Sequence, residues 1–183
     1  PAFDAMAQSF FTIGHSNRSL QDFIALLQEA RVGCLVDIRK LPGSRAQPQF
    51  NADRLSAALA GQDIAYLHLA ALGGLRGKTA GVPPERNGLW RNASFHRYAD
   101  YAGTPEFRAG LEQLLALGQG GRCALMCAEV LWWRCHRRIV ADHLLARGET
   151  VFHIMGPGKL DAARLTQGAV EEQDGTVRYP AVP

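Results

Sequence analysis

Short apolar runs alternate along the chain with longer segments in which apolar residues recur every three or four positions. The first pattern predicts strands and the second predicts helices. The predicted strands are residues 9–14, 33–38, 64–69, 122–128 and 150–155. Helices are predicted after Ser19 and at residues 51–60, 95–98, 105–115 and 135–147. The alternation of strands and helices along the chain predicts an α/β fold: a single domain built on a mostly parallel five-stranded sheet, with helices on both faces.

The pattern divides the chain into an α/β domain, residues 9–155, and a C-terminal extension, residues 156–183, that we expect to pack on the same domain. The domain carries a long basic loop at about residues 70–94, where glycines, prolines and cations replace the periodic pattern. In the extension, residues 160–165 are predicted to form a short helix. Asp174-Gly175 marks the turn of a hairpin.

The composition agrees with one domain. The 183 residues are 47% hydrophobic and 20% charged, with a formal net charge of only +3. Such a chain has material for a core of ordinary size, and disorder is excluded for most of it. No apolar run reaches the roughly 18 to 20 residues that cross a bilayer, so we expect a cytoplasmic protein with no membrane partner. Four cysteines are too few for a disulfide scaffold of this size. We expect reduced thiols, with Cys34 and Cys123 buried and inert.

Polar residues follow the first predicted strand. In a parallel sheet, sites form beyond the carboxyl ends of the strands. The first strand ends at Gly14, and four polar residues then precede a helix: His15, Ser16, Asn17 and Arg18. A helix N-terminus surrounded by such donors can bind an anion. The alternative is that the serine and asparagine side chains only cap the helix.

The second predicted strand ends in a charged pair, Asp37 and Arg39, which share one face by alternation. The loop beyond them adds Ser44 and Arg45. Charges at the end of an apolar strand are costly unless they have partners. The pair is therefore either a structural salt bridge or part of a site, in which Asp37 orients a histidine or acts as a base.

The densest chemistry follows the fourth predicted strand. Cys127 and Glu129 stand at its end, and Cys135, His136 and Arg137 open the next helix. A helix N-terminus and an arginine lower the pKa of a thiol, whereas apolar surroundings raise it. We predict that at least one of the two thiols titrates below about 8.5 if Arg137 turns inward. If it points to solvent, both thiols are structural.

Two other interpretations of these cysteines stay open. Cys127, Cys135 and His136 can join His15 or Asp37 around a metal ion, or the two thiols can form a redox pair. The sequence has no C-x-x-C pair. We therefore expect no cofactor, with a metal as the alternative.

Several motifs occur together and in order: TIGHSNRS at 12–19, VDIR at 36–39, PQFN at 48–51, LGG at 72–74, MCAE at 126–129 and CHR at 135–137. Their order and spacing resemble a bacterial and archaeal family catalogued as domain of unknown function 488, from about residue 11 to residue 154. The resemblance implies the same fold and the same site, because the Cys-Ala-Glu and Cys-His-Arg segments of that family match residues 127–129 and 135–137. It leaves the reaction open. Residues 131–133, Leu-Trp-Trp, depart from the polar, proline-containing linker of many members.

These residues predict one pocket at the carboxyl edge of the sheet, with Cys127, His15 and Asp37 inside it. We expect an enzyme that acts on a small anionic or nucleotide-like substrate, including a base within nucleic acid, as a cysteine-dependent transferase or hydrolase. The candidate catalytic residues are Cys127, Cys135, Glu129, His15 and Asp37. The candidate substrate-binding residues are Ser16, Asn17, Arg18, Arg39, Ser44, Arg45, His136 and Arg137.

Two alternatives belong to other classes of protein. In the first, the basic residues 76–97, interleaved with Trp90, Phe95 and Tyr98, form a nucleic-acid-binding module that grips phosphates and stacks on bases. In the second, the pocket senses an anion or a metal without turning it over. We also expect residues 76–97 to overhang the pocket, because they follow the third strand at the same edge.

Overall fold

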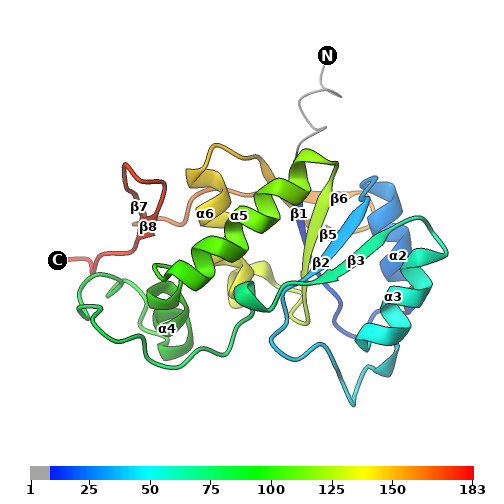
Figure 1. The fold of residues 1–183 in the computed structure, drawn as a ribbon, viewed down its shortest axis with the longest axis horizontal. Helices are drawn as coiled ribbons and strands as arrows, with labels where there is room; N and C mark the ends of the chain where they lie inside the picture. Colours follow the sequence, from blue (N-terminus) through cyan, green and yellow to red (C-terminus); the bar gives the residue numbers. More distant parts are fainter. Residues whose placement is uncertain (1–8) are drawn as a thin grey trace.

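The computed structural model describes residues 9–183 and shows an α/β domain around a six-stranded sheet (Figure 1). The strand order is β3-β2-β4-β1-β5-β6. The strands are β1 (Phe10–Gly14), β2 (Cys34–Asp37), β3 (Ala65–His68), β4 (Cys123–Cys127), β5 (Val151–Gly156) and β6 (Lys159–Ala162). The first five are parallel, and β6 pairs antiparallel with β5. The predicted fold class is confirmed, with one strand more than expected.

Helices cover both faces of this sheet (Figure 1). They are α2 (Leu20–Glu29), α3 (Ala52–Ala60), α4 (Ala93–Tyr101), α5 (Pro105–Gln119) and α6 (Arg137–Ala146). The first two pack on one face and the other three on the opposite face. Strand β1 shows why: Phe10 packs into the core under α4, α5 and α6, while Phe11 and Ile13 enter the core under α2 and α3. The period-two alternation of a strand therefore supplies both cores. In residues 9–183 no helix is both long and apolar enough to span a bilayer.

Local signals fix where several helices begin. Ser19 caps α2, its hydroxyl accepting a hydrogen bond from the Asp22 N–H at 3.0 Å. Thr104 caps α5 in the same way, and Pro105 occupies the first turn, where its missing N–H costs nothing. Caps of this kind contribute about 1 kcal/mol each.

The C-terminal extension differs in part from its prediction. The helix predicted at residues 160–165 is wrong, since Lys159–Ala162 form the edge strand β6. A turn at Gly158, which has a φ of +67°, folds these residues back onto β5, so that strand pairing decides their conformation. The predicted hairpin forms between β7 (Val170–Glu171) and β8 (Val177–Arg178).

Polar contacts fasten the end of the extension to the domain. The Tyr179 hydroxyl donates to Asp142 of α6 at 2.8 Å, and the Tyr179 N–H donates to the side chain of Asn87 at 3.1 Å. Asp142 also accepts a hydrogen bond from the Thr166 N–H at 2.9 Å. A buried carboxylate of α6 is thus satisfied by residues far along the chain.

The backbone at the end of β1 lies close to the loop that follows β4. The His15 N–H donates to the Cys127 carbonyl, and the Ser16 N–H donates to that of Ala128, both at 2.9 Å. This approach requires glycine at position 14, because a Cβ there would lie 1.9 Å from the Glu129 carbonyl oxygen. Gly14 therefore allows the loop after β4 to lie beside the loop after β1.

Gly14→Ala is expected to destabilise the fold by about 1–3 kcal/mol or more, because the backbone of residues 129–130 would have to move. Urea denaturation measures the change in the free energy of unfolding. Gly33→Ala is the matched control, since its nearest neighbour is a carbonyl oxygen at 4.0 Å. Equal effects of the two substitutions would contradict the close approach.

Buried histidines make stability depend on acidity. Burial lowers the pKa of His136 and His143 to about 4 and that of His153 to about 3. The folded protein keeps these rings neutral, while the unfolded chain takes up protons below about pH 6.5. The free energy of unfolding should therefore fall as the pH drops from about 6.5 to about 4. His143→Phe, whose ring would keep the contact with Phe107, should reduce the steepness of that fall in denaturation curves. Parallel curves for both proteins would contradict the assignment.

Candidate functional site

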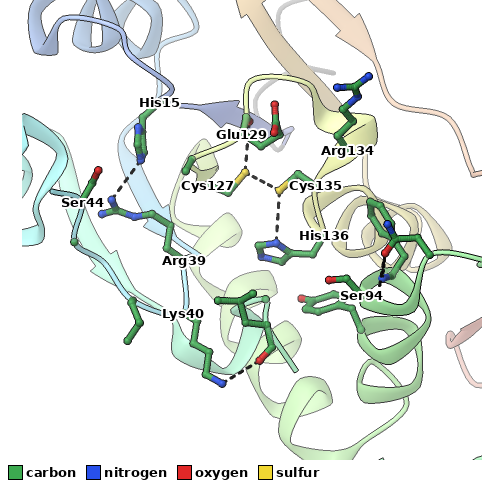
Figure 2. Close-up of a pocket in the computed structure, with 18 residues that line it drawn as sticks. His15, Arg39, Lys40, Ser44, Ser94, Cys127, Glu129, Arg134, Cys135 and His136 are labelled. Atoms are coloured by element: carbon green, nitrogen blue, oxygen red, sulfur yellow. Dashed lines mark hydrogen bonds between the residues drawn. The ribbon is translucent and has the colours of Figure 1, made fainter. Parts of the chain in front are cut away.

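A cavity of about 530 Å³ opens where β1, β2 and β4 end. Figure 2 shows the two sulfur atoms of Cys127 and Cys135 at its centre. Of the thirteen predicted site residues, those that line the cavity are His15, Arg39, Ser44, Cys127, Glu129, Cys135 and His136. The structure thus brings these residues together from three distant parts of the chain, at position 15, at 39–44 and at 127–136.

The two thiols are the nearest functional pair in the cavity. Cys127 is the last residue of β4, and Cys135 follows the short 3-10 turn Trp132–Arg134, two positions before α6 begins at Arg137. Their Sγ atoms lie 2.6 Å apart, and both side chains are almost fully buried. The cysteines are free. At this distance the two sulfurs are in direct contact.

Arg137 supplies positive charge to the thiols from behind the cavity wall. Its side chain is 1% exposed, and one Nη donates to the Val130 carbonyl at 2.6 Å. The Nε and the other Nη are buried without a hydrogen-bond partner in residues 9–183. A buried cation without a carboxylate is costly unless other negative charge lies nearby. A thiolate provides that charge.

The two thiols consequently differ in acidity. Burial alone raises the pKa of a thiol, but at Cys127 the contact with Cys135 and the charge of Arg137 bring the pKa below its ordinary value. At Cys135, burial and the neighbouring sulfur raise the pKa well above that value. The pKa of Cys127 is therefore the lower of the two, and that of Cys135 the higher.

His136 stands next to the Cys135 thiol. Its Nε2 lies 3.0 Å from the Ile38 carbonyl, and its Nδ1 lies 3.5 Å from the Cys135 sulfur. Burial lowers the pKa of this ring to about 4, so it is neutral at physiological pH. A carbonyl only accepts hydrogen bonds, so Nε2 carries the proton of the neutral ring. Nδ1 is then free to accept the proton of the Cys135 thiol.

On the opposite wall, His15 faces Arg39 (Figure 2). The His15 ring stacks on Phe50, its Nδ1 lies 2.8 Å from the Ser16 carbonyl, and its Nε2 lies 3.4 Å from an Arg39 nitrogen. Burial lowers the pKa of His15 below 6.5. A neutral ring placed in this way accepts a hydrogen bond from Arg39 at Nε2. The lone pair of Nε2 is therefore already engaged and is less available to take up a proton.

Asp37 lies behind this wall and does not line the cavity. Its carboxylate accepts two hydrogen bonds from the Arg39 side chain, at 2.7 and 2.9 Å, and one from the Tyr66 hydroxyl at 2.5 Å. Of the two sequence interpretations, the structure contains the salt bridge. The expectation that Asp37 shares the pocket with His15 and Cys127 is therefore corrected: it holds Arg39 in place.

Several other predicted residues also lie away from the cavity lining: Ser16, Asn17, Arg18, Arg45 and Arg137. Arg18 donates to the Gly14 and Met155 carbonyls. Arg45 lines an adjoining surface hollow, which shares Gly43 and Ser44 with the cavity. Of the cysteines expected to be inert, Cys123 is buried and Cys34 is only half-buried.

The sequence model of one protein family matches residues 19–144, and its description is domain of unknown function DUF488. The chain belongs to this family. Neither the curated proteins nor the solved structures give a match. The matched range contains six of the seven predicted residues that line the cavity, both thiols among them, and His15 lies before it.

The DUF488 chain completes the cavity with residues that are not among the thirteen candidate site residues. Lys40 extends from the loop after β2, and Ser94 and Tyr98 come from α4. Leu41 and Leu75 are 73% and 72% exposed at the rim. Large exposed apolar side chains beside a polar cavity are a sign of a binding site. The sequence alone does not show that these two leucines are exposed.

Only part of residues 76–97 approaches the cavity. Asn92, Ser94 and Phe95 line it, whereas the cations of that stretch do not. Arg76 pairs with Glu106 and Arg86 pairs with Glu172. Among residues 9–183 there is also no group of three or more His, Cys, Asp and Glu side chains arranged to hold a metal ion.

Arg137→Met should raise the pKa of Cys127, because burial would then act without the opposing charge of the guanidinium. The pH dependence of iodoacetamide labelling at Cys127, followed by mass spectrometry, measures this pKa. Arg138→Met is the control, since Arg138 lies over the ring of Trp90 and donates to Thr166. If the Arg137→Met profile equals that of the wild-type protein, the guanidinium does not set the acidity of the thiol.

Proposed function

We propose that this DUF488 protein is a cysteine-dependent enzyme that acts on a small anionic, nucleotide-like substrate, with Cys127 as the nucleophile. One observation carries the proposal: the Cys127 thiol lines the cavity while the buried Arg137 beside it lacks a carboxylate partner. A thiolate, not a thiol, is the form that attacks. The charge that stabilises the thiolate is thus built into the fold.

In the proposed reaction, the Cys127 sulfur attacks an electrophilic atom of the substrate. A bond forms between that atom and sulfur as the bond to the leaving group breaks. Water or a second substrate then attacks the covalent intermediate and restores the thiolate. Glu129 lines the cavity with an exposed carboxylate, which makes it the better acceptor for the proton of that water. His15 is less suitable because its Nε2 faces Arg39.

The lining of the cavity supports an anionic substrate. Arg39, Lys40 and Arg134 contribute cationic side chains, against the single carboxylate of Glu129. In Figure 2 the Arg134 guanidinium points away from the sulfur pair, so it acts at the rim. Asp37 compensates Arg39, which lowers the net charge but keeps the guanidinium in a fixed direction.

A second part of the lining supports a substrate with a flat apolar portion. Leu41, Leu75 and Phe95 form this part, with Tyr98 beside them. The Tyr98 hydroxyl donates to the Leu72 carbonyl at 2.7 Å, so its ring is held still. A base or another aromatic ring fits such surroundings better than a purely polar anion does.

The alternative function, a nucleic-acid-binding module formed by residues 76–97, is favoured less by the local contacts than the proposed enzyme is. The Trp90 ring stacks on Phe95 at 5.0 Å and contacts Tyr179 at 5.2 Å, so it already has partners within the domain. Arg76 and Arg86 of residues 76–97 are likewise engaged in ion pairs with Glu106 and Glu172. Binding without turnover, as in a sensor, would leave Cys127 unmodified by substrates, and this separates a sensor from the proposed enzyme.

Iodoacetate and iodoacetamide differ in charge and little in size, and together they test the proposal. We expect iodoacetate to label Cys127 faster, relative to iodoacetamide, than it labels glutathione. Lys40→Gln and Arg134→Gln should each reduce this preference about two- to fivefold, the effect of one exposed charge. Arg91→Gln, an exposed arginine outside the lining, is the control. Labelling of Cys34 before Cys127, or no preference for the anion, would defeat the proposal.

A further inference from the structure

We propose that Cys127 and Cys135 form a dithiol–disulfide couple in which Cys135 resolves the covalent intermediate on Cys127. The substrate class is then an anionic compound with a reducible sulfur–sulfur bond. This inference rests on the proposed function, because it requires Cys127 to be the nucleophile. It adds the acceptor of the second step and the kind of atom that is attacked.

The placement of the two sulfurs carries the inference. They are 2.6 Å apart although eight positions separate them in the sequence. Cys127 ends the central strand β4, between β1 and β2, and Cys135 lies between the 3-10 turn Trp132–Arg134 and α6. The two sulfurs are already in contact, so little movement is needed to join them. A purely structural pair would not need a cavity beside it.

The surroundings of the two sulfurs give each a different role. Arg137 stabilises negative charge on Cys127, which makes this sulfur the first to attack. Cys135 keeps its proton and lies 3.5 Å from Nδ1 of the neutral His136. His136 is held in this orientation by the Ile38 carbonyl at 3.0 Å. A base is therefore in contact with the thiol that must lose its proton in the second step.

The proposed chemistry balances in two exchanges. In the first, the Cys127 thiolate attacks one sulfur of the substrate, forms a mixed disulfide and releases the other half as a thiolate. In the second, the Cys135 sulfur attacks the Cys127 sulfur while its proton passes by way of Nδ1 of His136 toward the departing half of the substrate. The Cys127–Cys135 disulfide forms, and the second half of the substrate leaves and takes up the proton. Two electrons pass from the protein to the substrate, and a small dithiol restores the reduced form.

The position of Cys135 narrows the substrate class. A thiol attacking the Cys127 sulfur can release a group bound through sulfur, but it cannot displace a carbon atom from a thioether. A second thiol this close to the nucleophile is therefore useful when the intermediate is a mixed disulfide. The cations of the lining, Arg39 and Lys40, favour the anionic members of this class.

Dithiodiglycolate, an anionic disulfide, and the neutral bis(2-hydroxyethyl) disulfide are the probes. In the wild-type protein, dithiodiglycolate should yield an internal disulfide between residues 127 and 135, seen by mass spectrometry of peptides as the loss of two hydrogens. Cys135→Ser should instead accumulate the mixed disulfide on Cys127. Cys127→Ser should form neither product, and Cys34→Ser should behave as wild type. The neutral probe should react more slowly than the anionic one.

His136→Asn tests the second step separately. It should slow the conversion of the mixed disulfide to the internal disulfide about a hundredfold, while formation of the mixed disulfide keeps its rate. Equal rates of conversion in the variant and the wild-type protein would overturn the role of His136 as the base. Circular dichroism and thermal unfolding show whether the variant is folded.

The outcomes separate this inference from the proposed function. A wild-type protein whose Cys127 reacts with iodoacetate, but which keeps a mixed disulfide without closing the internal one, overturns the couple and leaves the nucleophile intact. If Cys127 reacts with neither iodoacetate nor dithiodiglycolate, both proposals fail. Closure of the internal disulfide in the wild type, together with trapping in Cys135→Ser, supports both.

Discussion

A buried guanidinium without a carboxylate is the constraint on which the candidate site depends. Arg137 is enclosed at the first turn of α6, and in the described chain its polar contact is the Val130 carbonyl. In the proposed function, the negative charge that such a cation requires comes from a Cys127 thiolate. Electrostatics and protein stability then act in the same direction: the charge that balances the buried cation is also the proposed nucleophile.

A fixed charge on the far wall complements this arrangement. Arg39 is held at the cavity wall by the Asp37 carboxylate behind it, which also accepts a hydrogen bond from the Tyr66 hydroxyl. The two arginines thus differ in what balances them. Arg39 lines the cavity and is neutralised by a carboxylate, whereas Arg137 lies behind the lining, where its Nε and one Nη have no hydrogen-bond partner among residues 9–183.

The sequence predicted the features that depend on local signals. Helix caps such as Ser19, strand ends such as Cys127 and the family motifs placed the fold class and the thiol pair, because the ends of parallel strands meet at one edge. Contacts between distant segments were beyond its reach. The Tyr66 hydroxyl binds Asp37 behind the cavity wall, and Tyr98 lines the cavity from α4. Where a helix is predicted at residues 160–165, pairing with β5 produces the strand β6. None of these follows from periodicity.

The hydrogen bond between Tyr179 and Asp142 has a consequence for the order in which the chain folds. Asp142 lies on the same helix as Arg137, and its buried carboxylate is satisfied by the Thr166 N–H and the Tyr179 hydroxyl. During synthesis, every residue that lines the cavity has left the ribosome well before position 179. Yet the helix that carries the cation has its own buried carboxylate unsatisfied until those last segments arrive. The residues of the site therefore precede, along the chain, the segments that complete the burial of α6.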